Sequence, residues 1–390
     1  MERILISRFD AIGDVVLTIP MCGALKQLFP SCKIYFLGRT YTQPIIACCQ
    51  FVDEFVNADD LLKMTSKDAI AFIGAMNLDA VVHVSPNKTI AKLMKLAGVG
   101  MRIGTSHRLF HWGTVNYRVN LGRKNSLLHE AQLNFALLVP FSEKFKQAPT
   151  FEELISWYGF SAPSKKGNLN GKNDLGRQLL LAKVDELLAW AGERKKIILH
   201  PLSNASAREW SIAHFIHLID LLDTQTYAVF ISGTKQDGER LNSLLVKELG
   251  EDGLGKVAGK VAKEILDEMP RNISGEVKTI QKRLPEHVKI ITGDLNLTEF
   301  IELIAQSDAL VAASTGPLHI AAALGIGAIG IYPPMRPIHP GRWRPIGRKA
   351  KYVCLDKQCM DCKKTPQSCA CMQAIDANQV FKVLQTTVQN

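Results

Sequence analysis

Strand-like and helix-like runs alternate along this chain from its first residues, and this alternation constrains the fold more than any other feature. Short apolar runs occur at residues 3–7, 33–37, 80–84 and 102–104, and helix-like runs fill the gaps between them. Strands that alternate with helices are typical of a parallel sheet covered on both faces. The first half of the chain is therefore predicted to be a doubly wound α/β domain.

The same pattern restarts after residues 161–176, a polar segment rich in turn formers that we interpret as a linker or a long surface loop. Because 390 residues exceed one ordinary core, we expect two similar α/β domains, 1–170 and 171–375. Ligands of such sheets bind beyond the carboxyl ends of the strands, so two facing domains would form an interdomain cleft. Later strands are predicted at 196–200, 227–232, 288–291, 309–313 and 328–332, with helices at 211–223 and 297–306.

Composition narrows the class of partner. The net charge is +10 and the pI is about 9.1, which favours an anionic partner such as a nucleic acid, a nucleotide or an acidic lipid face. No apolar run reaches the roughly 18 residues that suggest a membrane span, and the first residues are strand-like rather than leader-like. We expect a cytoplasmic protein. The polar stretch 250–285 is interpreted as a surface insertion.

The turn after the predicted strand 309–313 is the clearest candidate for an anion site. Gly316 frees the backbone and Pro317 presets the helical φ, so unpaired N–H groups and the positive end of the helix dipole face outward. A diphosphate would fit there. The alternative is an ordinary capped turn, because residues such as Ser314 and Thr315 begin many helices.

The end of the first strand carries two carboxylates, Asp10 and Asp14, around a glycine turn at Gly13. The turn lacks the G-x-G-x-x-G pattern, which weakens an NAD-binding interpretation. Asp14 could act in catalysis, with Asp10 as its competitor, or it could simply stabilise the start of a helix. Pro20 is predicted to kink the helix-like run that follows.

Polar residues also follow two strands of the second half. Ser203, Ser206 and Arg208 suit phosphate contacts, since a guanidinium presents a planar fork to two oxygens. Gly233 and Asp237 end another strand, where ribose hydroxyls could bind. A solvated loop with a surface arginine is the alternative for the first of these segments.

Taken together, these segments resemble the ADP-heptose:lipopolysaccharide heptosyltransferases of glycosyltransferase family 9. The resemblance covers nearly the whole chain. Two features depart from the family pattern, because Ser314 stands where many members carry an acidic residue and the 250–285 stretch is unusual. The similar blocks run over residues 3–20, 102–104, 200–210, 314–324 and 342–347.

The resemblance implies a GT-B architecture of two Rossmann-like domains, with the acceptor held mainly by the first domain and the nucleotide sugar by the second. It implies an inverting transfer that requires no metal or cofactor, and a last helix, about 376–390, that crosses back onto the first domain. By position, Asp14 matches the general base and Arg208 the basic residue beside the donor phosphates. The phosphate-binding turn matches Thr315, Gly316 and His319.

The chemistry of such a transfer gives these positions their roles. The acceptor hydroxyl must lose a proton as it attacks, and a carboxylate such as Asp14 can take it. The departing diphosphate gains charge, which oriented N–H groups, Arg208 and His319 would stabilise. We therefore expect Asp14 and Arg208 to be catalytic, and an ADP-sugar to be bound by Ser203, Ser206, Gly233, Asp237, Ser314, Thr315, Gly316, Pro317 and His319.

Basic residues interleaved with aromatic ones concentrate in residues 88–124. Nucleic-acid proteins show this mixture, but no recognised DNA or RNA motif accompanies it. Given the resemblance, we expect part of this face to meet a lipid-linked anionic saccharide at the inner face of the cytoplasmic membrane. The expected acceptor-binding residues are Asp10, Gly13, Arg102, Arg108 and Arg118.

The tail holds five cysteines in eighteen residues, Cys354, Cys359, Cys362, Cys369 and Cys371. Four thiolates could close a tetrahedral zinc site. Similar cysteine-rich tails occur in the resembling family without being needed for transfer, so no metal is expected.

The sequence favours an inverting glycosyltransferase that moves a sugar, expected to be L-glycero-D-manno-heptose, from an ADP-sugar to the lipopolysaccharide inner core. A nucleotide-sugar epimerase of the same fold and a noncatalytic sugar-nucleotide or anion-binding protein remain as alternatives. Neither the linkage, the acceptor sugar nor the oligomeric state follows from the sequence.

Overall fold

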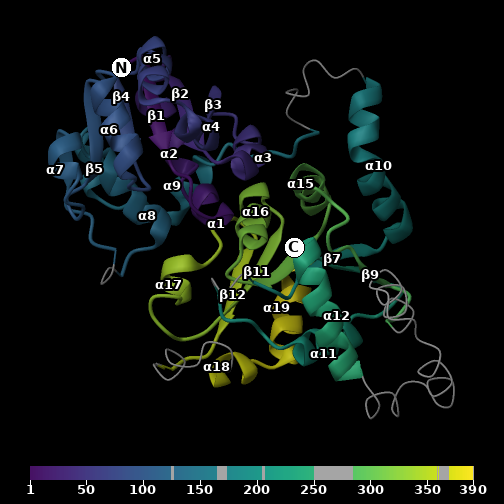
Figure 1. The fold of residues 1–390 in the computed structure, drawn as a ribbon. Helices are drawn as coiled ribbons and strands as arrows, with labels where there is room; N and C mark the ends of the chain where they lie inside the picture. Colours follow the sequence, from purple (N-terminus) through teal and green to yellow (C-terminus); the bar gives the residue numbers. More distant parts are fainter. Residues whose placement is uncertain are drawn as a thin grey trace, which may run out of the picture. The chain divides into compact units, whose positions relative to one another are not determined.

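The computed structural model describes residues 1–123, 127–164, 174–203, 207–249, 284–357, 359 and 369–389. The chain forms two compact units (Figure 1). The first unit contains Met1–Asp174 together with two later segments, Ala322–Gly325 and Gly341–Arg348. The second unit contains Leu175–Ala321, Ile326–Pro340 and Lys349–Asn390.

The first unit is built on a six-stranded sheet in which every neighbouring pair of strands is parallel. The four strands expected from the sequence are confirmed. Two short strands at the edges of this sheet, β3 and β6, were not predicted. In spatial order, the strands are β3 (Glu54–Asn57), β2 (Lys33–Gly38), β1 (Arg3–Ser7), β4 (Ala80–His83), β5 (Met101–Thr105) and β6 (Tyr117–Val119).

Helices connect these strands and cover the sheet. Where the sequence predicted a kink at Pro20, the helical run is interrupted: α1 ends at Val16 and α2 begins at Pro20. Proline suits the first turn of a helix, because a backbone N–H at that position has no partner within the helix. The helices are α1 (Ile12–Val16), α2 (Pro20–Leu28), α3 (Gln43–Ala47), α4 (Ala58–Lys63), α5 (Ser66–Ala75), α6 (Lys88–Leu96), α7 (His111–Thr114), α8 (Glu130–Phe135) and α9 (Phe151–Ser156).

The second unit repeats this architecture with its own six parallel strands. The five strands expected here are confirmed, and the edge strand β12 was not predicted. In spatial order, the strands are β12 (Ala350–Cys354), β11 (Gly327–Tyr332), β10 (Ala309–Ala313), β7 (Lys195–His200), β8 (Tyr227–Ile231) and β9 (Val288–Ile290).

The remaining helices are α10 (Asp174–Ala191), α11 (Ile212–Asp220), α12 (Lys235–Leu249), α15 (Leu297–Ala305), α16 (Gly316–Leu324), α17 (Pro340–Trp343), α18 (Ala370–Gln373) and α19 (Ala377–Gln389). Within the described ranges, no helix combines the length and the apolar character needed to cross a bilayer. Residues 165–173 of the expected linker and 250–283 of the expected insertion lie outside the described residues.

Both sheets have the same strand order, and this order determines where a ligand can bind. Successive strands are added on one side of the first strand of each unit and then on the other, so the direction reverses between β1 and β4 and between β7 and β10. The connections leave the sheet on opposite faces at such a point and open a crevice at the carboxyl ends of the strands. Functional residues are therefore expected at these two sheet edges.

The last helix, expected at about 376–390, is α19, and its expected return to the first domain stays a prediction. Within the second unit, α19 packs against α11, β11 and β12. The physical reason is its apolar stripe, since Val380 and Leu384 are fully buried in the core of that unit. Trp210 fixes the start of this segment through an indole N–H that donates to the carbonyl oxygen of Ile375 at 2.9 Å.

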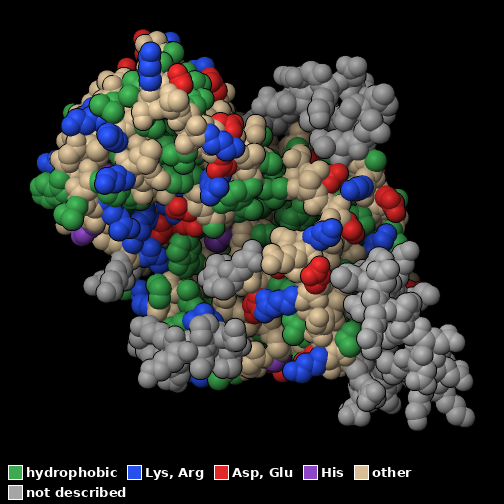
Figure 2. All heavy atoms as spheres, in the orientation of Figure 1, with side chains coloured by type: hydrophobic (Ala, Val, Ile, Leu, Met, Phe, Trp, Pro, Cys, Tyr) green, Lys and Arg blue, Asp and Glu red, His purple; other side chains and the backbone are tan. Residues whose placement is uncertain are grey.

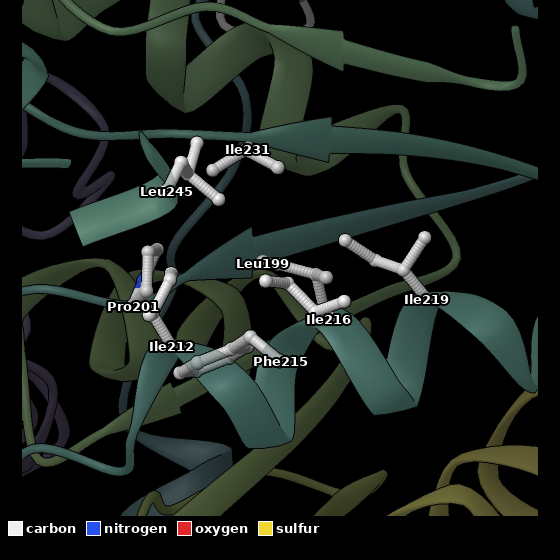
Figure 3. Close-up of a pocket in the computed structure, with 8 residues that line it drawn as sticks. All are labelled: Leu199, Pro201, Ile212, Phe215, Ile216, Ile219, Ile231 and Leu245. Atoms are coloured by element: carbon white, nitrogen blue, oxygen red, sulfur yellow. The ribbon is translucent and has the colours of Figure 1, made fainter. Parts of the chain in front are cut away.

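The interior of the second unit contains a small apolar gap between α11 and the sheet (Figure 3). Its volume is about 10 Å³, close to that of a single water molecule, and its lining is entirely apolar. We interpret this space as a packing gap in the core rather than a ligand site. The side chains around it are Leu199, Pro201, Ile212, Phe215, Ile216, Ile219, Ile231 and Leu245.

Two glycines in helices of the first unit provide a matched test of this packing. A Cβ on Gly23 would lie 2.3 Å from the carbonyl oxygen of Trp157, whereas a Cβ on Gly74 would meet nothing within 4 Å. We expect Gly23→Ala to destabilise the protein by about 1–3 kcal/mol through overpacking. Gly74→Ala should stabilise it by about 0.5–1 kcal/mol. Urea midpoints of the two variants measure this, and equal midpoints would contradict the close approach of α2 and Trp157.

Candidate functional site

A pocket opens at the carboxyl ends of β1 and β4, at the point where the strand order of the first unit reverses. Its volume is about 360 Å³, and all its lining residues belong to the first unit. The pocket brings two of the predicted carboxylates together with a predicted acceptor-binding arginine. The lining residues are Arg8, Asp10, Asp14, Val84, Ser85, Pro86, Arg108, Arg123, Glu130, Arg342 and Trp343.

Arg8 lies at the centre of this pocket and is almost completely buried. Its Nε atom lies 3.0 Å from a carboxylate oxygen of Asp10, and one terminal nitrogen pairs with Asp14. The other terminal nitrogen lies 3.5 Å from Glu130. A single guanidinium therefore holds three carboxylates in fixed positions, as its planar array of donors allows.

Glu130 is the most buried charge of the pocket, with a side chain that is 2% exposed. Three guanidiniums surround it, from Arg8, Arg123 and Arg342, the last at 2.6 Å. A carboxylate withdrawn this far from water is tolerated when it is paired and hydrogen-bonded.

Neither Glu130 nor Arg123 was predicted from the sequence as a site residue. Arg342 was part of a block similar to the family, without a predicted role. It donates to Glu130 and to the backbone carbonyl of Arg123, so it attaches the segment Gly341–Arg348 to the pocket. The same attachment includes a hydrogen bond of 2.9 Å between the His129 ring and the carbonyl oxygen of Arg344.

Asp14 is the better placed of the two predicted carboxylates. Both oxygens of Asp10 are engaged, one with Arg8 and the other with the hydroxyl of Ser85, which donates to it at 2.6 Å. Asp14 pairs with Arg8 through one oxygen, and its other oxygen accepts no hydrogen bond from the described part of the chain. Asp14 therefore has an oxygen available to take a proton.

Burial raises the pKa of Asp14 above its ordinary value. The positive charge of Arg8 lowers this pKa, while the negative charges of Glu130 and Asp10 raise it again. A carboxylate with a raised pKa is a stronger base when ionised, which suits a group that accepts a proton from an alcohol.

Two of the predicted acceptor-binding arginines lie elsewhere in the first unit. The Nε atom of Arg102 donates to the carbonyl oxygen of Thr114 at 2.9 Å, and a terminal nitrogen donates to Val99. The guanidinium of Arg118 stacks over the ring of Trp112 at 4.8 Å. Arg102 therefore fastens the backbone around β5, and neither residue lines the pocket that contains Arg108. Gly13 lies inside α1, where its carbonyl oxygen accepts from the N–H of Leu17.

The corresponding edge of the second unit contains the predicted anion turn. Thr315 precedes α16 and His319 lies in its first turns, and both side chains are more than nine-tenths buried. Among the described residues, the hydroxyl of Thr315 and the Nδ1 atom of His319 have no hydrogen-bond partner. A buried polar atom without a partner costs free energy, so these two atoms indicate a place for a polar ligand.

The histidine of this turn carries no charge near neutral pH. Burial lowers the pKa of His319 to about 4. The predicted role of His319 beside a diphosphate is therefore limited to a hydrogen bond. The hydroxyl of Ser314 is hydrogen-bonded to the buried Tyr332, which holds the turn against β11. Gly316 and Pro317 are the first two residues of α16, as the turn predicted.

The other predicted donor-binding residues of this unit already have local partners. The hydroxyl of Ser203 donates to the carbonyl oxygen of Ala207 at 3.3 Å, and its N–H donates to Glu209. The carboxylate of Asp237 accepts from the N–H and the hydroxyl of Thr234, an interaction that caps α12.

Local packing also explains the glycine at position 233, because a Cβ on Gly233 would lie 2.9 Å from the Cβ of Asp237. Arg208 is half-buried in the loop after β7, and Ser206 lies outside the described residues. The expected ribose and phosphate contacts of these residues stay predictions.

The cysteine-rich tail forms no metal centre within the described ranges, where no group of three or more potential ligands is arranged around a common point. Cys369 and Cys371 are buried, and the thiols of Cys359 and Cys371 are hydrogen-bonded to each other. Burial raises the pKa of Cys354 to about 11 and so keeps this thiol protonated. Cys362 lies outside the described residues.

Comparison with known proteins finds a family model that matches part of this chain, and relatives that extend over more of it. Residues 270–373 match the model of glycosyltransferase family 9 (heptosyltransferase). A Haemophilus influenzae protein whose name assigns it to the glycosyltransferases is 26% identical over 90% of this chain and 88% of its own length. The lipooligosaccharide heptosyltransferase 2 of the same organism is 28% identical over 44% of this chain and 40% of its own length.

Solved structures share the fold over the whole chain. The ADP-heptose lipopolysaccharide heptosyltransferase II of Escherichia coli has a TM-score of 0.70 at 16% identity, with 100% of this chain and 99% of that chain covered. A family 9 glycosyltransferase from Veillonella parvula has a TM-score of 0.68 at 16% identity, with 100% and 97% covered. The resemblance inferred from the sequence is confirmed: the chain is a glycosyltransferase, one part of it matches the model of glycosyltransferase family 9, and it is similar to the heptosyltransferases.

Proposed function

We propose that this glycosyltransferase transfers a heptose from an ADP-sugar to the anionic inner core of lipopolysaccharide, with inversion at the anomeric carbon and at the inner face of the cytoplasmic membrane. The observation that carries the proposal is the carboxylate of Asp14 at the switch point of the first sheet, with one oxygen held by Arg8 and the other accepting no hydrogen bond from the described residues. The names of the family and of its E. coli neighbour support the choice of donor and acceptor.

In this proposal the first unit binds the acceptor and activates its hydroxyl group. The oxygen of Asp14 that is not bonded to Arg8 takes the hydroxyl proton as the acceptor oxygen attacks the anomeric carbon. Arg8 fixes the orientation of the carboxylate, and Asp10 and Ser85 in turn fix Arg8. Arg108 contributes a positive charge at the same pocket, where it would attract an anionic saccharide.

The second unit binds the donor in this proposal. The first-turn N–H groups of α16 and the hydroxyl of Thr315 would receive the diphosphate, whose negative charge increases as the bond to the sugar breaks. Arg208 would add a positive charge beside it. Transfer requires the acceptor oxygen and the anomeric carbon to meet, so the proposal requires that the two units bring their sites together around one reaction.

The experiment that tests this function is a panel of ADP-heptose, ADP-glucose and UDP-sugars offered with truncated lipopolysaccharide core acceptors, followed by mass spectrometry of the products. Addition of one heptose from ADP-heptose supports the proposal. Epimerisation of a donor in the absence of acceptor would instead identify a nucleotide-sugar epimerase.

Replacing the proposed base tests the mechanism. We expect Asp14→Asn to lower kcat by about 10²- to 10⁴-fold, because the amide cannot take the proton. The affinity for ADP, measured by calorimetry, should be unchanged, since the donor is bound by the other unit. Asp10→Asn is the matched control and should lose less activity, because both oxygens of Asp10 serve to hold Arg8 and Ser85. Full turnover by Asp14→Asn would refute the assignment.

Glu130 is proposed as a positioning residue, and its removal should move the pH profile. The negative charge of Glu130 raises the pKa of Asp14, so Glu130→Gln should lower that pKa. The acidic limb of the kcat/KM profile should then shift to lower pH, since Asp14 stays ionised further into the acid range. Glu130→Asp keeps the charge and should keep the limb. A uniform loss of activity without a shifted limb would indicate a purely structural role.

The donor turn has its own test. Thr315→Val keeps the shape of the side chain and removes a hydroxyl that no described residue satisfies, so we expect unchanged thermal stability and about 5- to 10-fold weaker ADP binding. Thr387→Val is the matched control, because that hydroxyl donates to the carbonyl oxygen of Val383 at 2.7 Å. If Thr315→Val lowers stability and leaves ADP affinity intact, the turn is structural.

A further inference from the structure

The first unit contains a long stretch of sequence without any acidic residue. Between Asp79 and Glu130 the chain has no Asp or Glu and eight Lys or Arg, which supply most of the net charge of +10. Two of these side chains form interactions within the protein: Arg123 pairs with Glu130, and Arg102 donates to backbone carbonyl oxygens. The others are Lys88, Lys92, Lys95, Arg108, Arg118 and Lys124.

Three of these lysines form a stripe on α6. Lys88, Lys92 and Lys95 are spaced by four and three residues, which places them on one side of the helix, and all three are exposed. The ammonium group of Lys95 donates to the carbonyl oxygen of Gly113 at 2.9 Å, so the stripe reaches α7. Figure 2 shows Lys and Arg side chains gathered over this part of the first unit, around α6 and β5.

Two large apolar side chains are exposed at the end of this stripe. Leu109 is 91% exposed and Trp112 is 61% exposed, three residues apart at the start of α7. Trp112 is held in this position, because its indole N–H donates to the carbonyl oxygen of Ser106 at 3.2 Å and the guanidinium of Arg118 stacks on its ring. The exposed indole is therefore a fixed feature of the surface.

We propose that this α6–α7 surface binds the headgroup region of an anionic lipid bilayer. The α6–α7 surface consists of Lys88, Lys92, Lys95, Leu109, Trp112 and Arg118. Its cations are attracted to acidic headgroups, while Leu109 and Trp112 enter the boundary between headgroups and acyl chains, where indole rings are enriched.

A nucleic acid would use the cations of this surface but would leave Leu109 without a suitable partner, because binding there rests on phosphate contacts and on aromatic stacking. The exposed aliphatic side chain of Leu109 therefore favours a lipid partner over a nucleic acid.

The position of this surface fits the proposed function, on which this part of the inference rests. Arg108 lines the pocket that contains Asp14, and the adjacent Leu109 would enter the membrane. A saccharide attached to a lipid in the bilayer would therefore lie near the pocket.

The test is cosedimentation of the full chain with vesicles, without donor or acceptor. We expect binding to vesicles of phosphatidylcholine mixed with phosphatidylglycerol, little binding to pure phosphatidylcholine, and weakening by salt. The triple variant Lys88→Gln, Lys92→Gln, Lys95→Gln should bind about tenfold more weakly with a reduced salt dependence. The double variant Leu109→Ser, Trp112→Ser should bind about tenfold more weakly with its salt dependence retained.

Controls separate this surface from general effects. Phe72→Ser and Tyr352→Ser remove side chains that are 42% and 45% exposed outside the patch, and both should bind vesicles like the wild type. Unchanged thermal unfolding of each variant establishes that it is folded. Equal binding to neutral and anionic vesicles, unaltered binding by both patch variants, or tighter binding to an oligonucleotide than to anionic vesicles would overturn the proposal.

A second measurement distinguishes failure of this inference from failure of the proposed function. Transfer to a delipidated core saccharide in solution does not need a membrane, so the Leu109→Ser, Trp112→Ser variant should retain it. A wild-type protein that binds anionic vesicles but transfers no sugar would contradict the proposed function alone. A protein that transfers sugar but does not bind anionic vesicles would contradict the proposal of a membrane-binding surface alone.

Discussion

The buried carboxylate of Glu130 and the three guanidiniums around it hold the pocket of the first unit together. Each guanidinium comes from a different part of the chain: Arg8 follows β1, Arg123 follows β6, and Arg342 belongs to the segment Gly341–Arg348. Removal of one partner from such a buried set typically costs about 3–5 kcal/mol, because the remaining charges stay away from water without compensation. The same ions orient Arg8, and through it Asp14, so the stability of the pocket and the position of the proposed base have one origin.

Two copies of one strand order give this chain two sheet edges of different chemistry. In the first unit the reversal between β1 and β4 presents carboxylates and guanidiniums, whereas in the second the reversal between β7 and β10 presents a helix N-terminus with two buried polar atoms that no described residue satisfies. The shared backbone thus provides the two positions, and the residues that follow each strand determine the chemistry at each. A transferase needs both kinds of site, and duplication of the fold provides them without a change of architecture.

The sequence predicted those features that depend on local pattern. Buried strands such as β10 appear as continuous apolar runs, and Asp14 could be placed at the end of β1 because a glycine turn precedes it. The edge strands β3, β6 and β12 escaped prediction because they are short and partly exposed, which weakens any apolar pattern. Glu130 escaped because its partner Arg342 is 212 residues distant, and no local signal pairs them. Charge alone did not reveal that the guanidinium of Arg102 binds backbone carbonyls or that the guanidinium of Arg118 stacks on a ring.

The balance of charge in the first pocket favours an anion. Four guanidiniums line it, from Arg8, Arg108, Arg123 and Arg342, against the three carboxylates of Asp10, Asp14 and Glu130. The surplus is one positive charge, and it rises to two when Asp14 accepts a proton. The neighbouring His83 does not alter this balance near neutral pH, because burial lowers its pKa to about 3. In the proposed mechanism, proton uptake by Asp14 would therefore increase the attraction for an anionic saccharide as its hydroxyl becomes the nucleophile, so one set of ions would serve both binding and activation.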